Sequence, residues 1–353
     1  MPNLLKTMFK NRKIIFFFLI ILTIILFSLF TSKNKTKLIS ASTDVTRFIS
    51  FGDNPHVPEE EVKDYLSMLI ASINNKKVSL VIHVGDTLGG REPCSNSMID
   101  LQKDIMNQLY APVLYTPGDN EWRDCYQEKK VDVYNNLDRL EYIRKTHFSN
   151  KKTLGKNPVH IENQSQKGYP ENARLIINNV VFISAHVVGS NNNFDPSNDI
   201  NTMEYRERDS ANISWVKESF KKYERASAFV VAIHADMYAN KSTFLPAYEK
   251  FGMSLYKISN EFQKPVLILF GDSHEFKDFQ PMPKNYPYIH AIENYGNPDI
   301  KALMIEVDAS KNKPFYIVEV IKGESFLTWT LRNIRRVINY LIRNFQKIID
   351  NFK

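Results

Sequence analysis

Apolar and polar residues follow two patterns along this chain, and together they predict a succession of strands and helices. Short apolar runs that end in turns predict strands at 45–53, 77–86 and 112–119. Between these runs, apolar residues recur at helical spacing over residues 59–73 and 97–110. Strands that alternate with helices in this way are typical of an α/β fold with parallel strands.

The second half of the chain repeats the pattern. Residues 174–188 predict a hairpin that turns at Asn178-Asn179, and a long helix is expected from about Glu204 to Ala226. The remaining predicted elements are strands at 227–236, 265–274, 300–308 and 314–323 and a helix at 248–262. We expect the last two strands to pair antiparallel and one domain to span residues 44–324.

The N-terminus carries an uncharged apolar run, residues 14–30, preceded by four basic residues. A spanning helix needs roughly 17–25 apolar residues, whereas the apolar part of a cleaved signal peptide is usually about 7–15 residues long. We therefore expect a basic segment at 1–13, an uncleaved transmembrane anchor at 14–32 and a polar linker at 33–43. A cleaved signal is the alternative. The anchor predicts a single-pass protein whose domain lies on the extracytoplasmic side.

The C-terminal segment, residues 325–353, predicts an amphipathic basic helix. Its apolar side chains fall on one arc, and Arg332, Arg336, Arg343 and Lys347 lie on the other side. This profile fits a helix that lies on an anionic membrane surface. A helix docked on the domain itself, or a dimer contact, remains open.

The net charge of +7 over 353 residues could indicate a nucleic-acid partner or an anionic membrane. The basic residues are dense at both termini, beside the apolar segments, so the charge favours the membrane and we expect no nucleic-acid partner. The 43% of hydrophobic residues is ordinary for a globular protein with an ample core.

Polar residues of the kind that bind metals follow five of the predicted strands directly. They are Asp53 with His56, Asp86, Asp119 with Asn120 and Glu121, His234, and Asp272 with His274. Each Gly-Asp pair alone could be a turn. Side chains at the carboxyl ends of strands in an α/β sheet converge on one crevice, however, and crowded carboxylates repel unless cations lie between them. Asp and His together suit divalent metals.

This set resembles the calcineurin-like metallophosphoesterase superfamily, which includes the purple acid phosphatases. The family pattern runs Asp-x-His, Gly-Asp, Gly-Asn-His-Glu/Asp, a lone His, and Gly-His-x-His, and its order matches this chain from Asp53 to His274. The resemblance implies that Asp53 and His274 bind a first metal and that Asp86 bridges two metals. It implies further that Asp119, His234 and Asp272 bind the second. The fold it implies is a four-layer α/β/β/α sandwich with mixed sheets.

Several positions depart from that pattern. Pro55 stands where the family has its first His, which leaves His56 as a further candidate ligand. The Asp-rich second site favours manganese, iron or magnesium over zinc for the two divalent ions. Asn120 stands where the family has its catalytic His, and an amide cannot deliver a proton. Glu121, Arg123 and His56 are the candidate substitutes.

The chain has two cysteines, Cys94 and Cys125. In the implied fold they follow two strands whose loops emerge at the same edge of the sheet, so we expect a disulfide there. Two unpaired thiols are the alternative, as in a cytosolic protein.

The sequence thus predicts a membrane-anchored phosphoesterase. Its phosphorylated substrate, an ester or an anhydride, would be hydrolysed by a metal-bound hydroxide at the cell envelope. The alternative is a catalytically impaired protein of the same fold that acts as a binding or interaction module, because Asn120 replaces the catalytic His.

Overall fold

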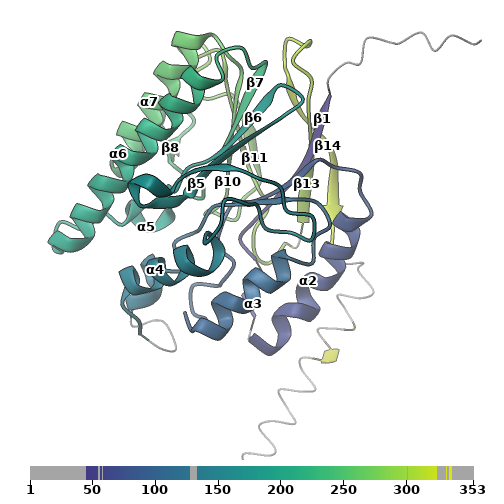
Figure 1. Ribbon diagram of the computed structural model, residues 1–353, viewed down its shortest axis with the longest axis vertical. Helices are drawn as coiled ribbons and strands as arrows, with labels where there is room; N and C mark the ends of the chain where they lie inside the picture. Colours follow the sequence, from purple (N-terminus) through teal and green to yellow (C-terminus); the bar gives the residue numbers. More distant parts are fainter. Residues whose placement is uncertain are drawn as a thin grey trace, which may run out of the picture. The chain divides into compact units, whose positions relative to one another are not determined.

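The predicted strands build two β-sheets. This computed structural model describes residues 45–54, 56–57, 59–127, 133–299 and 301–323, together with residues 331, 334 and 335. Within these residues one sheet has five strands, in the order β14-β13-β1-β2-β3. Figure 1 labels three of them, β14, β13 and β1. A second has seven strands, in the order β11-β12-β10-β7-β6-β5-β4, and β8 (Tyr238–Asn240) pairs with β9 (Thr243–Phe244).

The first sheet contains the three predicted N-terminal strands and the two C-terminal strands. Its strands are β1 (Thr46–Phe51), β2 (Leu80–His83), β3 (Val113–Tyr115), β13 (Lys301–Val307) and β14 (Phe315–Lys322). As predicted, β1, β2 and β3 are parallel, because α2 (Glu59–Asn74) and α3 (Asn96–Met106) carry the chain back between them. The predicted antiparallel pairing of β13 with β14 is confirmed.

The second sheet is mixed in the same way. Its strands are β4 (Glu162–Gln164), β5 (Tyr169–Ile177), β6 (Val180–Ser184), β7 (Ala228–Ala232), β10 (Val266–Phe270), β11 (Lys277–Phe279) and β12 (Ile289–Glu293). The predicted hairpin is confirmed: β5 and β6 are antiparallel across Asn178-Asn179, whose φ angles are 47° and 64°. Two positive φ angles are what a type I′ hairpin turn requires, and Asn tolerates them well.

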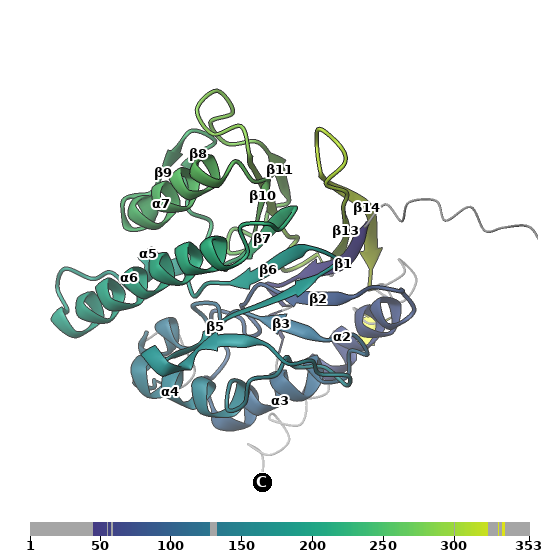
Figure 2. The same cartoon turned by 45° about the horizontal axis from the view of Figure 1, so that its top comes forward.

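Apolar side chains fill the space between the two sheets and cover their outer faces. Phe48 of β1 meets Phe182 of β6 edge to face, with ring centroids 5.2 Å apart, in the core between the sheets. α2, α3 and α4 (Asn136–His147) pack on the first sheet. α6 (Asp199–Lys222) and α7 (Pro246–Phe262) pack on the second (Figure 2). The described residues are therefore layered helix, sheet, sheet, helix.

The prediction for the long helix was wrong at both ends. α6 begins at Asp199 rather than near Glu204, because the side chain of Asn198 accepts hydrogen bonds from the N–H groups of Ile200 and Asn201. It ends at Lys222, before the predicted Ala226. A capping Asn in an Asn-rich stretch gave no distinct signal in the sequence.

No helix among the described residues is long and apolar enough to cross a bilayer. The predicted segments 1–13, 14–32 and 33–43 lie outside those residues, as does 325–353 apart from residues 331, 334 and 335. The anchor and the amphipathic helix therefore stay predictions.

Candidate metal centre

Five of the predicted ligands come together where the two sheets meet. Asp53, Asp86 and Asp119 follow strands β1, β2 and β3 of the first sheet, and His234 and Asp272 follow β7 and β10 of the second. One ligand atom from each of Asp53, Asp86 and His234 lies within 4.8 Å of the others. The same holds for Asp119, His234 and Asp272, so His234 belongs to both groups.

The glycine before each acid is needed for close approach and not only for a turn. A Cβ atom at Gly271 would overlap Oδ2 of Asp53, and one at Gly118 would overlap Oδ1 of Asp86. These two glycines therefore leave space for a carboxylate from another strand end. The Gly-Asp pairs are a packing requirement of the site itself.

His234 has a defined orientation in the site. Its Nδ1–H donates to the carbonyl oxygen of Val84 over 2.9 Å. Nε2 faces the acids, 2.9 Å from Oδ1 of Asp119 and 3.3 Å from Oδ1 of Asp86. Burial opposes the charged imidazole, but the two carboxylates outweigh it and raise the pKa of His234 well above its usual value. A proton on Nε2 occupies the position that a metal ion would take, as is usual for a ligand held by its other nitrogen.

The acids are short of positive charge. Burial raises the pKa of Asp53 to about 7, and burial together with the charge of Asp119 raises the pKa of Asp272 to about 7. Burial also raises the pKa of Asp86 well above its usual value. Asp119 differs, because the hydrogen bond and charge of His234 outweigh burial and lower its pKa to about 2.

The surroundings of one oxygen of Asp53 also show that the buried acids lack a positively charged partner. Oδ2 of Asp53 is buried and has no hydrogen-bond partner among the described residues. A buried carboxylate oxygen without a partner is costly unless it binds a cation. The converging oxygens and the imidazole nitrogen therefore fit a pair of divalent metal ions.

His274 and His56 lie at the edge of this group. Nδ1–H of His274 donates to the carbonyl oxygen of Asn297 over 3.0 Å, and its Nε2 lies 3.7 Å from Oδ1 of Asp53. The ring of His56 lies 5.2 Å from that of His274, and its backbone N–H donates to the side chain of Asn297. Pro55 lies outside the described residues. His274 is thus oriented towards Asp53, while His56 contacts the site through His274.

The three predicted catalytic residues have separate positions. Asn120 contacts Asp86 twice: its backbone N–H donates to Oδ1 over 3.1 Å and its side-chain amide donates to Oδ2. Glu121 is buried and accepts hydrogen bonds through Oε1 from the N–H of Thr87 and the hydroxyl of Tyr115. These contacts hold Glu121 against the loop that follows β2 and against strand β3.

Arg123 is held away from the acids. Its guanidinium donates to Asp124 over 2.9 Å and lies over the ring of Tyr126, 5.5 Å from the centroid. No contact in the described residues joins Arg123 to Asp53, Asp86 or Asp119. In this arrangement the guanidinium contacts Asp124 and Tyr126 and not those three acids.

A disulfide joins Cys94 and Cys125, with 5.8 Å between their Cα atoms. The two sulfur atoms lie 3.5 and 3.7 Å from the carbonyl oxygen of Asn120. Both cysteines are fully buried. The bridge therefore packs directly beneath the residue that holds Asp86.

The sequence interpretation missed Ser190 and Gly189. The hydroxyl of Ser190 donates to Oδ2 of Asp119 over 2.7 Å. A Cβ atom at Gly189 would overlap Asp272 Oδ1 and lie 2.6 Å from Asp119 Oδ1. The run Gly-Ser-Asn-Asn-Asn could have indicated an unusual turn here, because Asn adopts positive φ angles more readily than most residues.

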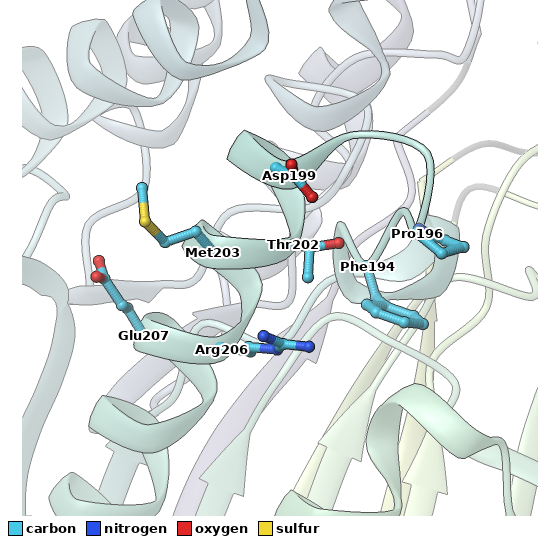
Figure 3. Close-up of a pocket in the computed structure, with 7 residues that line it drawn as sticks. All are labelled: Phe194, Pro196, Asp199, Thr202, Met203, Arg206 and Glu207. Atoms are coloured by element: carbon cyan, nitrogen blue, oxygen red, sulfur yellow. The ribbon is translucent and has the colours of Figure 1, made fainter.

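A cavity of about 600 Å³ lies beyond this run, at the N-terminal half of α6. Figure 3 shows Arg206 reaching across it towards Phe194, while Met203 and Glu207 point the other way. None of the predicted ligands lines the cavity. It is a surface feature separate from the metal centre.

Comparison with known proteins gives one family. The sequence profile described as calcineurin-like phosphoesterase matches residues 46–276 of this chain. That range contains every predicted ligand, from Asp53 to His274. A search of the curated proteins found no match.

Solved structures show a distant likeness. GAP50, described as the anchor in the inner membrane complex of Plasmodium, is 12% identical over 80% of this chain and 90% of its own, with a TM-score of 0.45. A dimetal phosphatase from Danio rerio is 10% identical over 79% and 99%, with a TM-score of 0.46. A phosphatase from Mycoplasma pneumoniae is 15% identical over 79% and 93%, with a TM-score of 0.39. Likeness at this level says nothing about activity.

Proposed function

Because the chain belongs to the calcineurin-like phosphoesterase family, we propose that it is a metal-dependent hydrolase of a phosphoester or phosphoanhydride. The observation that carries the proposal is the pair of overlapping ligand groups that share His234. Buried acids that lack compensating positive charge, beside an imidazole with one nitrogen already bonded, fit a metal site.

The residues divide between two ions. Asp53 and His274 would hold one ion, and Asp119, His234 and Asp272 would hold the other, with Asp86 shared. Two divalent ions at such a site activate a water molecule and neutralise charge on the phosphoryl group. The preponderance of carboxylate oxygens favours manganese, iron or magnesium over zinc.

Asn120 determines what the chain itself contributes to the reaction. Its two hydrogen bonds fix the carboxylate of Asp86, but its amide cannot protonate a leaving group. General acid catalysis is typically worth about 10²–10⁴-fold, so we expect slow hydrolysis of esters with poor leaving groups. Aryl phosphates and phosphoanhydrides, whose leaving groups need no proton, should be the better substrates. His56, beside His274, is the candidate proton donor.

The same feature supports a second candidate function. With Asn120 bonded to Asp86, the site could bind a phosphorylated ligand without turning it over. The protein would then be a binding module. Turnover that depends on metal and on Asp86 separates the two functions.

We also propose that the domain lies on the extracytoplasmic side of a membrane. The uncharged run at 14–30 supports an anchor, and the Cys94–Cys125 disulfide supports an oxidising compartment. A membrane-impermeant protease added to intact cells should remove the domain and leave the N-terminal segment. A domain protected until the cells are lysed would contradict this orientation.

The function is tested by hydrolysis of an aryl phosphate and an aryl phosphodiester by the full chain in detergent, with Mn²⁺ supplied. Asp86→Asn, which keeps the shape of the shared ligand, is the matched control. We expect turnover in the parent and none in the variant. A folded parent that binds Mn²⁺ but hydrolyses neither ester would favour the binding module, and one that binds no Mn²⁺ would refute the proposed metal centre.

A further inference from the structure

A left-handed turn lies against the metal centre. Ser190, Asn191, Asn192 and Asn193, which follow Gly189 at α5 (Gly189–Asn192), have φ angles of 49°, 60°, 53° and 63°. Positive φ costs a residue other than glycine free energy, and four such residues in succession are rare. Strain of this kind is kept where the surrounding structure fixes it, and it clusters at functional sites.

Contacts from two helices hold this turn in place. Arg208 of α6, fully buried, donates to the side-chain oxygen of Asn192 over 2.7 Å and to its carbonyl oxygen over 2.9 Å. The hydroxyl of Tyr248 in α7 accepts a hydrogen bond from the N–H of Asn192. Asn193 donates to Glu204 of α6 over 2.8 Å. The turn is therefore an anchored part of the fold.

The anchored turn delivers two groups to Asp119. Gly189 passes so close to Asp119 and Asp272 that no side chain fits there. Ser190 then places its hydroxyl 2.7 Å from Oδ2 of Asp119. Oδ1 of the same carboxylate is directed at Nε2 of His234, 2.9 Å away. One oxygen is thus held by Ser190, and the other faces the metal centre.

The donor suits the residue that stands at this position. A carboxylate carries no hydrogen and can only accept hydrogen bonds, so Asp119 needs a donor at this position. The serine hydroxyl provides that donor. We propose that Ser190 is a positioning residue that fixes Asp119 as a metal ligand through Oδ2, and that the left-handed turn exists to present it.

This inference rests on the proposed metal centre, and the test separates the two. Ser190→Gly removes the hydroxyl but keeps the backbone, because glycine adopts positive φ without cost. Groups that hold a metal ligand in place are typically worth about 10–100-fold in metal affinity. We expect Ser190→Gly to weaken Mn²⁺ binding by about 10-fold, measured by titration calorimetry on the full chain in detergent. The melting temperature of the metal-free variant should not fall.

Asn191→Gly is the matched control, because Asn191 lies in the same turn but is exposed, and its side chain donates to the carbonyl oxygen of Phe194 and to no metal ligand among the described residues. It should leave Mn²⁺ affinity unchanged. A merely structural role for Ser190 would lower the melting temperature of the metal-free Ser190→Gly protein. That result, or unchanged Mn²⁺ affinity beside a parent that binds, would overturn this inference alone. A parent that binds no Mn²⁺ would overturn the metal centre as well.

Discussion

The domain buries carboxylates in two places, and their pKa values shift in opposite directions. At the metal centre, Asp53 and Asp272 have pKa values raised to about 7. In a second group, which we call the Glu171 cluster (Glu171, Arg144 and His186), the pKa of Glu171 is lowered to about 2. Burial alone would raise it, but the charge of Arg144 and the hydrogen bond from His186 outweigh burial.

The difference lies in the cations that the chain supplies. Arg144 donates to both oxygens of Glu171, with its closest contact at 2.6 Å, and His186 Nδ1 lies 2.9 Å from Oε1. The two ligand groups of the metal centre together hold four acids and a single imidazole, that of His234. One group is balanced by protein side chains, and the other requires cations from outside. The comparison separates a structural ion pair from a ligand site on physical grounds.

The largest effect should follow from unbalancing the Glu171 cluster. Arg144→Met leaves the fully buried Glu171 without its main cation. Breaking a buried pair typically costs about 3–5 kcal/mol, and we expect that loss in the free energy of unfolding measured by urea denaturation. Adding Glu171→Gln should recover part of it. A loss below about 1 kcal/mol would mean that the cluster is not balanced by Arg144.

Removing the disulfide should have the second-largest effect on the free energy of unfolding. The bridge lies beside Asn120, at the metal centre. Cys94 and Cys125 are 31 residues apart, and a loop of that size is worth about 3–4 kcal/mol in the chain-entropy model. We expect Cys94→Ser with Cys125→Ser to lower the free energy of unfolding by that amount. A reducing agent should destabilise the parent but not the double variant. Equal stability with and without reductant in the parent would contradict this.

Metal should sharpen the comparison, because only one of the two groups lacks cations. At 100 times its dissociation constant, Mn²⁺ should raise the free energy of unfolding by about 2.7 kcal/mol. Asp86→Asn should lose this increment, whereas Arg144→Met should keep it. Thermal denaturation with Mn²⁺ and with a chelator measures both. An increment that survives in Asp86→Asn would place the bound metal elsewhere.

The smallest effect concerns pH in the Glu171 cluster. The folded-state pKa of about 2 lies below the ordinary value of 4.5, so the unfolded chain takes up the proton first as the pH falls. The stability that Glu171 contributes is present above pH 4.5 and is lost progressively towards pH 2. We expect about 1 kcal/mol of this loss between pH 4.5 and 3.5 in metal-free protein. Glu171→Gln should show less loss over that interval.

The sequence predicted the strand ends well and the contacts between them poorly. The spacing of apolar residues and the identity of turn residues are local signals. The positions of Asp53, Asp86 and Asp119 after three parallel strands could therefore be predicted. Ser190 lies 71 residues from Asp119, and nothing near it in the sequence indicates that contact. Its neighbours Asn191 to Asn193 predict a turn but not its handedness, which Arg208 and Tyr248 fix from other helices.

Glu121 and Arg123 show what closeness in sequence does not specify. Their closeness in sequence to Asn120 made them candidates for proton transfer. The structure directs them elsewhere, because Tyr115 and Thr87 hold Glu121 and Asp124 holds Arg123. Side-chain direction after a strand end depends on such partners, and a sequence pattern does not specify them.

His234 also has a consequence for how the protein is made. His234 links the two sheets. It follows β7 of the second sheet, and its Nδ1–H donates to the carbonyl oxygen of Val84, which follows β2 of the first. It lies 115 residues after Asp119 in the chain. During synthesis, the first three acids therefore emerge long before the imidazole and Asp272 that complete the ligand groups. A ribosome-bound chain that ends before β7 lacks His234 and Asp272, so we expect a metal at the proposed centre to bind only after most of the domain has been made.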